Sequence, residues 1–169
     1  RTVVVDVGKI TAVEAGYRAA GPGDTVVELR NGTLLPGLMD MHVHLTFEYS
    51  RSYELDRFTK GAADRALNGA MNAKKTLLAG FTTVRDLEDA SRASISLRNA
   101  VNDGKVPGPR IFAAGKAIAS TGGHVDPTNG WADVLKVDSG PADGVINGAD
   151  QAAAAVRQRY KEGSDVIKI

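Results

Sequence analysis

The sequence contains no cysteine, and this absence narrows the chemistry that the chain can carry. Without thiols it forms neither disulfides nor thiolate–metal bonds, so any metal must be held by histidine, carboxylate or a less usual ligand. Histidine is scarce as well, with three in 169 residues. Two of the three form the motif His42-Val43-His44, which is therefore the first place to look for chemistry.

Other features are missing too. No apolar run approaches the length that spans a bilayer, and the sequence has no basic run of the kind that nucleic-acid-binding proteins carry. A formal net charge of +1 favours no class of partner. We therefore expect neither a membrane nor a nucleic acid as partner. The lack of cysteine and of a visible targeting segment favours the cytoplasm.

Both ends of the chain lie inside strand-like segments. The sequence begins with Arg1 directly before a run of valines, and it ends in Asp165-Val166-Ile167-Lys168-Ile169. We expect that the chain is a fragment of a longer protein and that the native N-terminus is missing. The length itself suits one domain or a little more.

Residues 1–35 have the pattern of a small β unit. Gly8-Lys9 and Asn31-Gly32 are the expected turns, and the second is a strong hairpin signal because both of its residues tolerate positive φ. The expected strands are Thr2–Val7, Ile10–Val13, Thr25–Leu29 and Thr33–Leu35.

From Pro36 onwards, predicted strands alternate with predicted helices. The strands are Leu38–His44, Phe81–Val84, Ile111–Ala114 and Val166–Ile169. The helices are Thr59–Ala79, one that Ser91 caps and that ends near Asn102, and one that Asp150 caps and that ends near Gly163. This alternation predicts an α/β fold with parallel strands and right-handed crossovers. Because no GxGxxG motif follows a strand, we favour the first half of a (β/α)₈ TIM-type barrel over a dinucleotide-binding fold.

A long segment rich in glycine, proline and aspartate, residues 115–148, follows the third predicted barrel strand. Loops of this length in compact domains are usually functional. In a (β/α)₈ barrel, this loop would lie at the C-terminal face, where such enzymes keep their active sites. It contains the third histidine, His124.

The spacing of His42 and His44 suits a metal site. Side chains at i and i+2 of a strand project to the same side, so two imidazoles can aim at one point. Two ligands alone do not complete a zinc site. A pair of strand histidines that hydrogen bonds satisfy is therefore the alternative at this stage.

Four segments carry a more specific signal. They are Leu35–His44, Gly80–Asp86, Pro107–Ile111 with Thr121–His124, and Asp165–Ile169. In this order they resemble the amidohydrolase superfamily of metal-dependent hydrolases. The Thr-Gly-Gly-His segment is similar to the branch of imidazolonepropionase-like proteins, prolidases and related metallo-carboxypeptidases.

The resemblance implies two domains and a metal centre. Residues 1–35 would be the N-terminal part of a composite β-sandwich, and residues 36–169 the first four βα units of the hydrolase barrel. It implies two metal ions, usually zinc, with His42 and His44 on one metal and Lys168 bridging both as a carbamate (N6-carboxylysine) formed from CO₂. Two further histidines and an aspartate would follow Ile169, and a hydroxide that bridges the metals would attack an amide bond.

The strand pattern gives a separate physical reason to consider Lys168 as a ligand. Strand parity puts Lys168 and Val166 on one face, and Ile167 and Ile169 on the other. If the isoleucines pack against helices, Lys168 points into the barrel, where burial shifts a lysine pKa down toward the neutral amine. A neutral amine can add CO₂ to give an anionic ligand. The alternative is a lysine that extends its charge to the strand end.

His124 is expected to contact the carbonyl or carboxylate of the substrate, because Gly122 and Gly123 let the backbone approach closely. The alternative is an exposed loop histidine. Arg85 and Asp86 are expected to form a structural ion pair at the barrel rim.

Three aromatic residues lie on loops at the predicted active face, where they line the pocket or pack the loops down. They are Tyr49, Tyr53 and Trp131.

The family resemblance implies a small-molecule or dipeptide substrate and a homo-oligomer. We favour an Xaa-Pro dipeptidase, followed by a carboxypeptidase for C-terminal Arg or Lys and an imidazolonepropionase-type ring hydrolase. A non-catalytic relative that keeps the barrel is the rival from another class. A self-sufficient half-barrel is disfavoured because its parallel strands would leave open edges.

Overall fold

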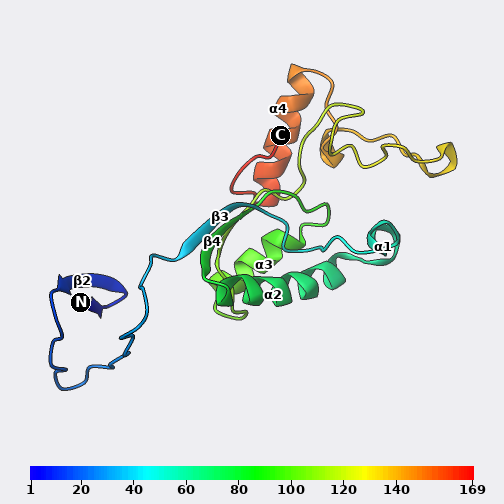
Figure 1. The fold of residues 1–169 in the computed structure, drawn as a ribbon. Coiled ribbons are helices and arrows are strands. Elements are labelled where there is room, and N and C mark those ends of the chain that lie inside the picture. Colours follow the sequence, from blue (N-terminus) through cyan, green and yellow to red (C-terminus); the bar gives the residue numbers. More distant parts are fainter. The chain divides into compact units, whose positions relative to one another are not determined.

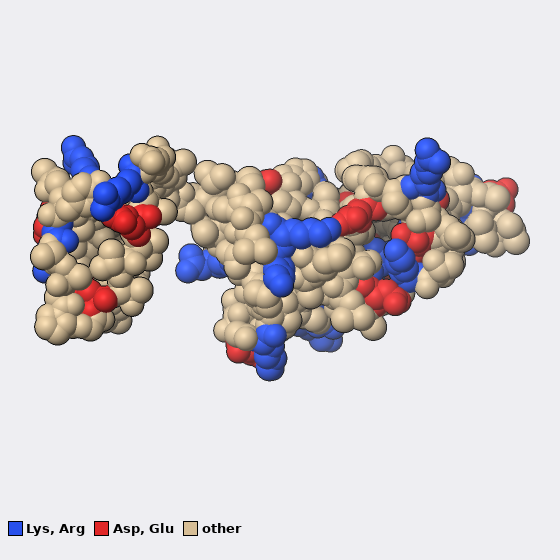
Figure 2. Space-filling view, turned by 60° about the horizontal axis from the view of Figure 1, so that its bottom comes forward, with Lys and Arg blue, Asp and Glu red and all other residues tan.

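The computed structural model describes residues 1–169 and divides them into two compact units, Arg1–Leu35 and Pro36–Ile169 (Figure 1). No helix is both long and apolar enough to cross a membrane. On the face that Figure 2 shows, acidic and basic side chains are intermixed, so charge alone does not mark a binding surface there.

The first unit contains one antiparallel hairpin, β1 (Thr2–Asp6) and β2 (Lys9–Glu14). Its turn consists of Val7 and Gly8, which both have positive φ (45° and 72°). Positive φ at both central residues gives a turn whose twist matches that of the flanking strands. The first predicted hairpin therefore forms, but its turn lies one residue earlier than the predicted Gly8-Lys9, because Lys9 pairs with Asp6.

The second predicted hairpin of this unit is wrong. Residues 25–29 and 33–35 form no strands, although the turn at Asn31-Gly32 is present, with the Gly32 amide donating to the Leu29 carbonyl at 3.2 Å. The apolar side chains here are 58–73% exposed at Val26, Val27, Leu29, Leu34 and Leu35. A two-stranded hairpin is marginal without a layer to pack against, and this unit offers none.

The second unit is built on a parallel sheet of three strands in the order β3-β4-β5. The strands are β3 (Leu38–Val43), β4 (Phe81–Asp86) and β5 (Arg110–Ala113). The connecting helices α2 (Ala62–Leu78) and α3 (Ala93–Asn102) pack against each other and against the sheet (Figure 1). The predicted mixed α/β fold is thus confirmed.

The core lies between this sheet and α2 and α3. Its buried members are Leu45, Ala73, Val84, Ile95, Leu97, Ile111 and Ala113. Helix α2 comes close to α3 at Gly69, where a Cβ atom would lie 3.0 Å from Cδ2 of Leu97. The absence of a side chain at Gly69 therefore allows Leu97 to fill the contact between the helices.

The predicted helix Thr59–Ala79 forms as α2, which begins three residues later, and a separate helix that was not predicted precedes it. Helix α1 (Tyr53–Thr59) ends before α2 because Lys60 and Gly61 are extended. The Asp64 carboxylate accepts a hydrogen bond from the Gly61 amide at 2.9 Å, which closes the start of α2. The break places α1 in the connection that follows β3.

The predicted helix caps are wrong at both later helices. Helix α3 begins after Arg92. The amide of Ser94 in its first turn donates a hydrogen bond to the carboxylate of Asp89 at 2.7 Å, so Asp89 and not Ser91 caps the helix. Asp89 takes this place because both of its oxygens accept, and Ser91 donates its own hydroxyl to one of them. Helix α4 (Ala149–Glu162) begins after Gly148, so Asp150 lies in its first turn.

The fourth predicted strand, Val166–Ile169, is not a strand in the structure. The segment still lies beside β5 and the residues after it: the Asp165 amide donates to the Ala113 carbonyl at 2.8 Å, and the Ile118 amide donates to the Lys168 carbonyl at 2.9 Å. The Asp165 side chain accepts a hydrogen bond from the Ala113 amide at 2.9 Å. A carboxylate thus occupies the place of a ladder carbonyl, which interrupts regular pairing.

Residues 114–148 form the long connection between β5 and α4. It contains two short 3₁₀ turns, Asp133–Leu135 and Pro141–Asp143, and a bridge between Ala119 and Val145. No longer element forms within it.

The core assignment predicts a stability difference between two leucines. Leu97→Ala should lower the free energy of unfolding of the full-length protein by about 2–5 kcal/mol, because the vacated space between α2 and α3 cannot fully collapse. Leu78→Ala is the matched control, since Leu78 is 76% exposed and Leu97 is 3% exposed. Urea unfolding measures both, and equal losses would contradict this core.

Candidate active site

The two histidines of the His-Val-His motif meet at the C-terminal end of β3. Their ring centroids lie 5.3 Å apart and the rings are inclined by 70°. The imidazole of His42 is exposed and that of His44 is half-buried. The i, i+2 spacing has therefore brought both rings to one side of the chain.

His44 has a ring nitrogen that is available to bind a metal ion. Its Nδ1 is buried and has no hydrogen-bond partner. Burial lowers the pKa of His44, and the nearby charges of His42 and Lys168 act in the same direction, whereas Glu88 opposes them. A neutral imidazole with an unpartnered nitrogen is the form in which histidine binds metals.

Lys168 lies in the same region. It lines an open cavity of about 300 Å³ together with His42, Arg85, Leu87 and the neighbours of Lys168 from Val166 to Ile169. Its side chain is half-buried. The predicted alternation holds, but Ile167 and Ile169 are 38% and 86% exposed, so they do not pack against helices as expected. Nothing in this chain covers that face of the segment.

His42, His44 and Lys168 supply only some of the ligands that a metal centre needs. No group of three His, Cys, Asp or Glu side chains in the structure is arranged to hold a metal ion. The two histidines supply two donors, and Lys168 supplies a third only as a carbamate, because an ammonium group has no lone pair. The buried, unpartnered Nδ1 of His44 is the observation that fits a ligand at this position.

Asp86 at the end of β4 fixes the position of the motif. Its side chain is fully buried, and Oδ2 accepts from the Leu45 amide at 2.9 Å, directly after His44. The Leu87 amide donates to the Val43 carbonyl at 3.1 Å. Burial, with the charges of Asp89 and Glu88, raises the pKa of Asp86 to about 7, although the hydrogen bond from Leu45 acts against the shift.

The predicted ion pair between Arg85 and Asp86 is wrong. Successive residues of a strand face opposite sides, so Asp86 is buried while Arg85 turns toward the cavity and donates from Nε to the Met41 carbonyl at 2.7 Å. Sequence reasoning missed the supporting role of Asp86. The available signal was an aspartate at the last position of a buried strand.

His124 lies apart from the other predicted site residues. It is exposed and has no ring contact or hydrogen bond with His42, His44 or Lys168. Its turn is well braced, because the Asp126 carboxylate accepts from the amides of Gly122 (2.9 Å) and Thr128 (3.0 Å). These hydrogen bonds lower the pKa of Asp126.

Trp131 packs the long loop onto α1. Its ring lies 5.3 Å from the ring of Phe58 and 5.0 Å from the guanidinium carbon of Arg57. Arg57 also donates to the Pro127 carbonyl at 2.7 Å. These contacts tie the loop that carries His124 to the helix that follows the His-Val-His motif.

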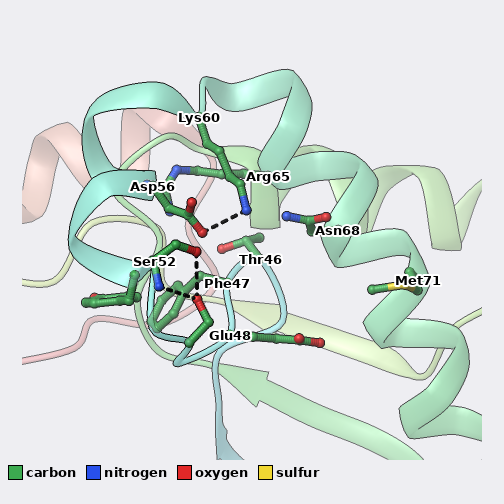
Figure 3. Close-up of a pocket in the computed structure, with 11 residues that line it drawn as sticks. Thr46, Phe47, Glu48, Ser52, Asp56, Lys60, Arg65, Asn68 and Met71 are labelled. Carbon is green, nitrogen blue, oxygen red and sulfur yellow. Dashed lines mark hydrogen bonds and ion pairs between the residues drawn. The ribbon is translucent and has the colours of Figure 1, made fainter.

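A small polar pocket of about 160 Å³ lies next to the motif (Figure 3). Thr46 and Phe47 line it from one side, and an ion pair between Lys60 and Asp56 (2.7 Å) crosses it. Phe47 connects this pocket to the candidate active site, because its ring stacks on that of His44 with centroids 5.0 Å apart.

Comparison with known proteins decides the family. The sequence pattern of the amidohydrolase family matches residues 33–169. The chain belongs to this family. The predicted superfamily and branch are thereby confirmed, since imidazolonepropionase of Idiomarina loihiensis is 40% identical over 63 residues, 37% of this chain and 15% of that protein.

Two longer matches cover most of this amidohydrolase chain. Ochratoxinase of Aspergillus niger is 28% identical over 158 residues, which are 80% of this chain and 30% of that protein. The crystal structure of an Xaa-Pro dipeptidase with bound methionine in the active site is 46% identical, with a TM-score of 0.85 over 94% of this chain and 39% of that one. The chain thus spans well under half the length of these relatives.

A prolidase complexed with N-methylphosphonate-L-proline is similar as well. It is 29% identical, with a TM-score of 0.62 over 86% of this chain and 37% of that one. The α/β fold of the second unit is therefore that of amidohydrolase structures.

The burial of Asp86 predicts a pH-dependent stability difference. The unfolded state releases this proton near the ordinary value of 3.8 and the folded state near 7, so stability is fully present below 3.8 and declines as pH rises to about 7. The decline from this group is on the order of 4 kcal/mol.

Asp86→Asn removes this contribution and keeps an oxygen for the Leu45 amide. The stability of the full-length variant relative to the native protein should therefore rise between pH 4 and pH 7, as measured by urea unfolding in the presence of a chelator. A constant difference across this range would contradict the assignment.

Proposed function

We propose that the full-length protein is a metal-dependent hydrolase that cleaves the amide bond of Xaa-Pro dipeptides. The closeness of the His42 and His44 rings at the end of β3, with Lys168 lining the same cavity as His42, is the observation that carries this proposal. The likeness to the Xaa-Pro dipeptidase and to the prolidase supports the choice of substrate. An imidazolonepropionase-type reaction is the second candidate, supported by the shorter match to that enzyme.

In this proposal, His42 and His44 would bind one zinc ion, and Lys168, as a carbamate, would provide the anionic ligand shared with a second. The unpartnered Nδ1 and lowered pKa of His44 support this role. Bound zinc would polarise the scissile carbonyl and lower the pKa of a water molecule. The rest of the protein would supply two further histidines and an aspartate as the general base.

The chain's own residues prepare the site. Asp86 holds the backbone after His44 through the Leu45 amide, which limits the positions that the imidazole can take. The braced turn presents the exposed imidazole of His124, which would donate to a carbonyl or carboxylate oxygen of the substrate. A donor that strengthens its hydrogen bond as charge develops on oxygen lowers the reaction barrier.

The same proposal assigns the two units. Residues 1–35 would form the N-terminal part of a composite β-sandwich, and residues 36–169 the first part of a (β/α)₈ barrel, with β3, β4 and β5 as its first strands. The strand order β3-β4-β5 supports the barrel, since consecutive parallel strands lie side by side. The exposed apolar residues between Val26 and Leu35 support a β-sandwich that further strands complete.

Lys168 provides the first test of the metal centre. Lys168→Ala should lose most of the bound metal and the activity, and small carboxylates added with zinc should restore part of both, because they replace the bridging anion. Elemental analysis measures the metal, and mass spectrometry of the native protein measures the added CO₂. Lys161→Ala changes an exposed lysine on α4 and is the control.

Metal-loaded protein with an unmodified Lys168 would contradict the carbamate. A Lys168→Ala variant that keeps its full metal content would contradict the bridging position.

His124 provides a test of substrate contact. His124→Asn should lower kcat/KM for an Xaa-Pro dipeptide by roughly 10²–10³, the range for removing one such donor, while metal content stays unchanged. A dipeptide library assayed with the zinc-loaded full-length protein measures the preference. Faster cleavage of dipeptides that end in Arg or Lys would instead indicate a carboxypeptidase, and no amide hydrolysis would reject the peptidase assignment.

A further inference from the structure

Three aromatic side chains form a cluster directly beside His44. The ring of Phe47 lies 5.8 Å from that of Tyr49 and 5.7 Å from that of Tyr53, and the two tyrosine rings are 5.0 Å apart. Phe47 also stacks on His44 with an angle of 24° between the rings. The cluster is therefore continuous with the proposed metal ligands.

The cluster is both ordered and open. Each ring contacts two others, and the Tyr53 amide donates to the Ser50 carbonyl at 3.1 Å, which closes the turn between Tyr49 and α1. Tyr49 is nevertheless 79% exposed. Fixed aromatic surface beside a reaction site binds an apolar group without first paying the entropy of ordering its own side chains.

The neighbouring loop has the opposite character. The Gly122–His124 turn follows β5 and presents the exposed imidazole of His124, whereas the aromatic cluster follows β3, and β4 lies between these two strands. The two loops therefore approach the site from different edges of the sheet. The C-terminal carboxylate of an Xaa-Pro dipeptide suits the polar turn, and its variable side chain suits the aromatic rings.

The Xaa-Pro substrate indicates which residue faces the cluster. Its C-terminal residue is always proline, so the N-terminal residue carries the variable side chain.

We propose that Phe47, Tyr49 and Tyr53 form the subsite for the side chain of the N-terminal substrate residue, and that this residue is large and apolar or aromatic. This inference rests on the proposed function, since it assigns a substrate side chain to the same site. It selects Phe-Pro over Gly-Pro, because only the first presents a ring to the cluster.

The test compares two substrates in the zinc-loaded full-length protein. The kcat/KM for Phe-Pro should exceed that for Gly-Pro by at least about tenfold, the value of burying a large apolar side chain. Tyr49→Ala should reduce this ratio about fivefold, because Phe-Pro loses a ring contact that Gly-Pro never makes. Tyr49→Phe keeps the ring and should keep the ratio.

Tyr160→Ala is the matched control, because Tyr160 on α4 is 83% exposed, like Tyr49, and lies outside the cluster. An unchanged ratio in Tyr49→Ala, or an equal fall in Tyr160→Ala, would overturn the subsite alone. Failure of the native protein to hydrolyse either dipeptide would overturn the proposed function and the subsite with it.

Discussion

The hydrogen bond between the Asp86 carboxylate and the Leu45 amide is the constraint on which the candidate site depends. It joins the ends of two parallel strands at the point where β3 leaves the sheet, so it decides where the chain of the His-Val-His motif turns. The carboxylate is fully buried and leaves Oδ1 without a partner. A buried acceptor without a partner destabilises the fold, which is a common property of residues that support active sites.

The electrostatics around the motif reflect the same burial. Removal from water lowers the pKa of His44 and raises that of Asp86, because burial disfavours the charged form of each group. A neutral histidine keeps a lone pair for a ligand. A neutral Asp86 reduces the local negative charge beside the strand end. The two shifts have one cause and act on neighbouring parts of the same turn.

The loops divide the chemistry between two edges of one small sheet. The connection after β3 contains the cluster of aromatic rings. In the connection after β5, the Asp126 carboxylate accepts hydrogen bonds from backbone amides, including that of Gly122. Arg57 and Trp131 tie the two connections together, through a carbonyl contact at 2.7 Å and a cation–π contact at 5.0 Å. These two contacts hold the loops on both sides of the candidate site to each other.

The sequence by itself determined the elements whose pattern is local: the three strands of the second unit, the helices between them, and the shared direction of His42 and His44. Strand and helix periodicity depends on neighbouring residues, so it can be read without the fold. Tertiary structure decided the rest. Asp86 accepts a hydrogen bond from the Leu45 amide at the end of another strand, and the Asp165 carboxylate took the place of a strand carbonyl at Ala113. These outcomes depend on contacts between residues far apart in the sequence, and only the folded chain brings such residues together.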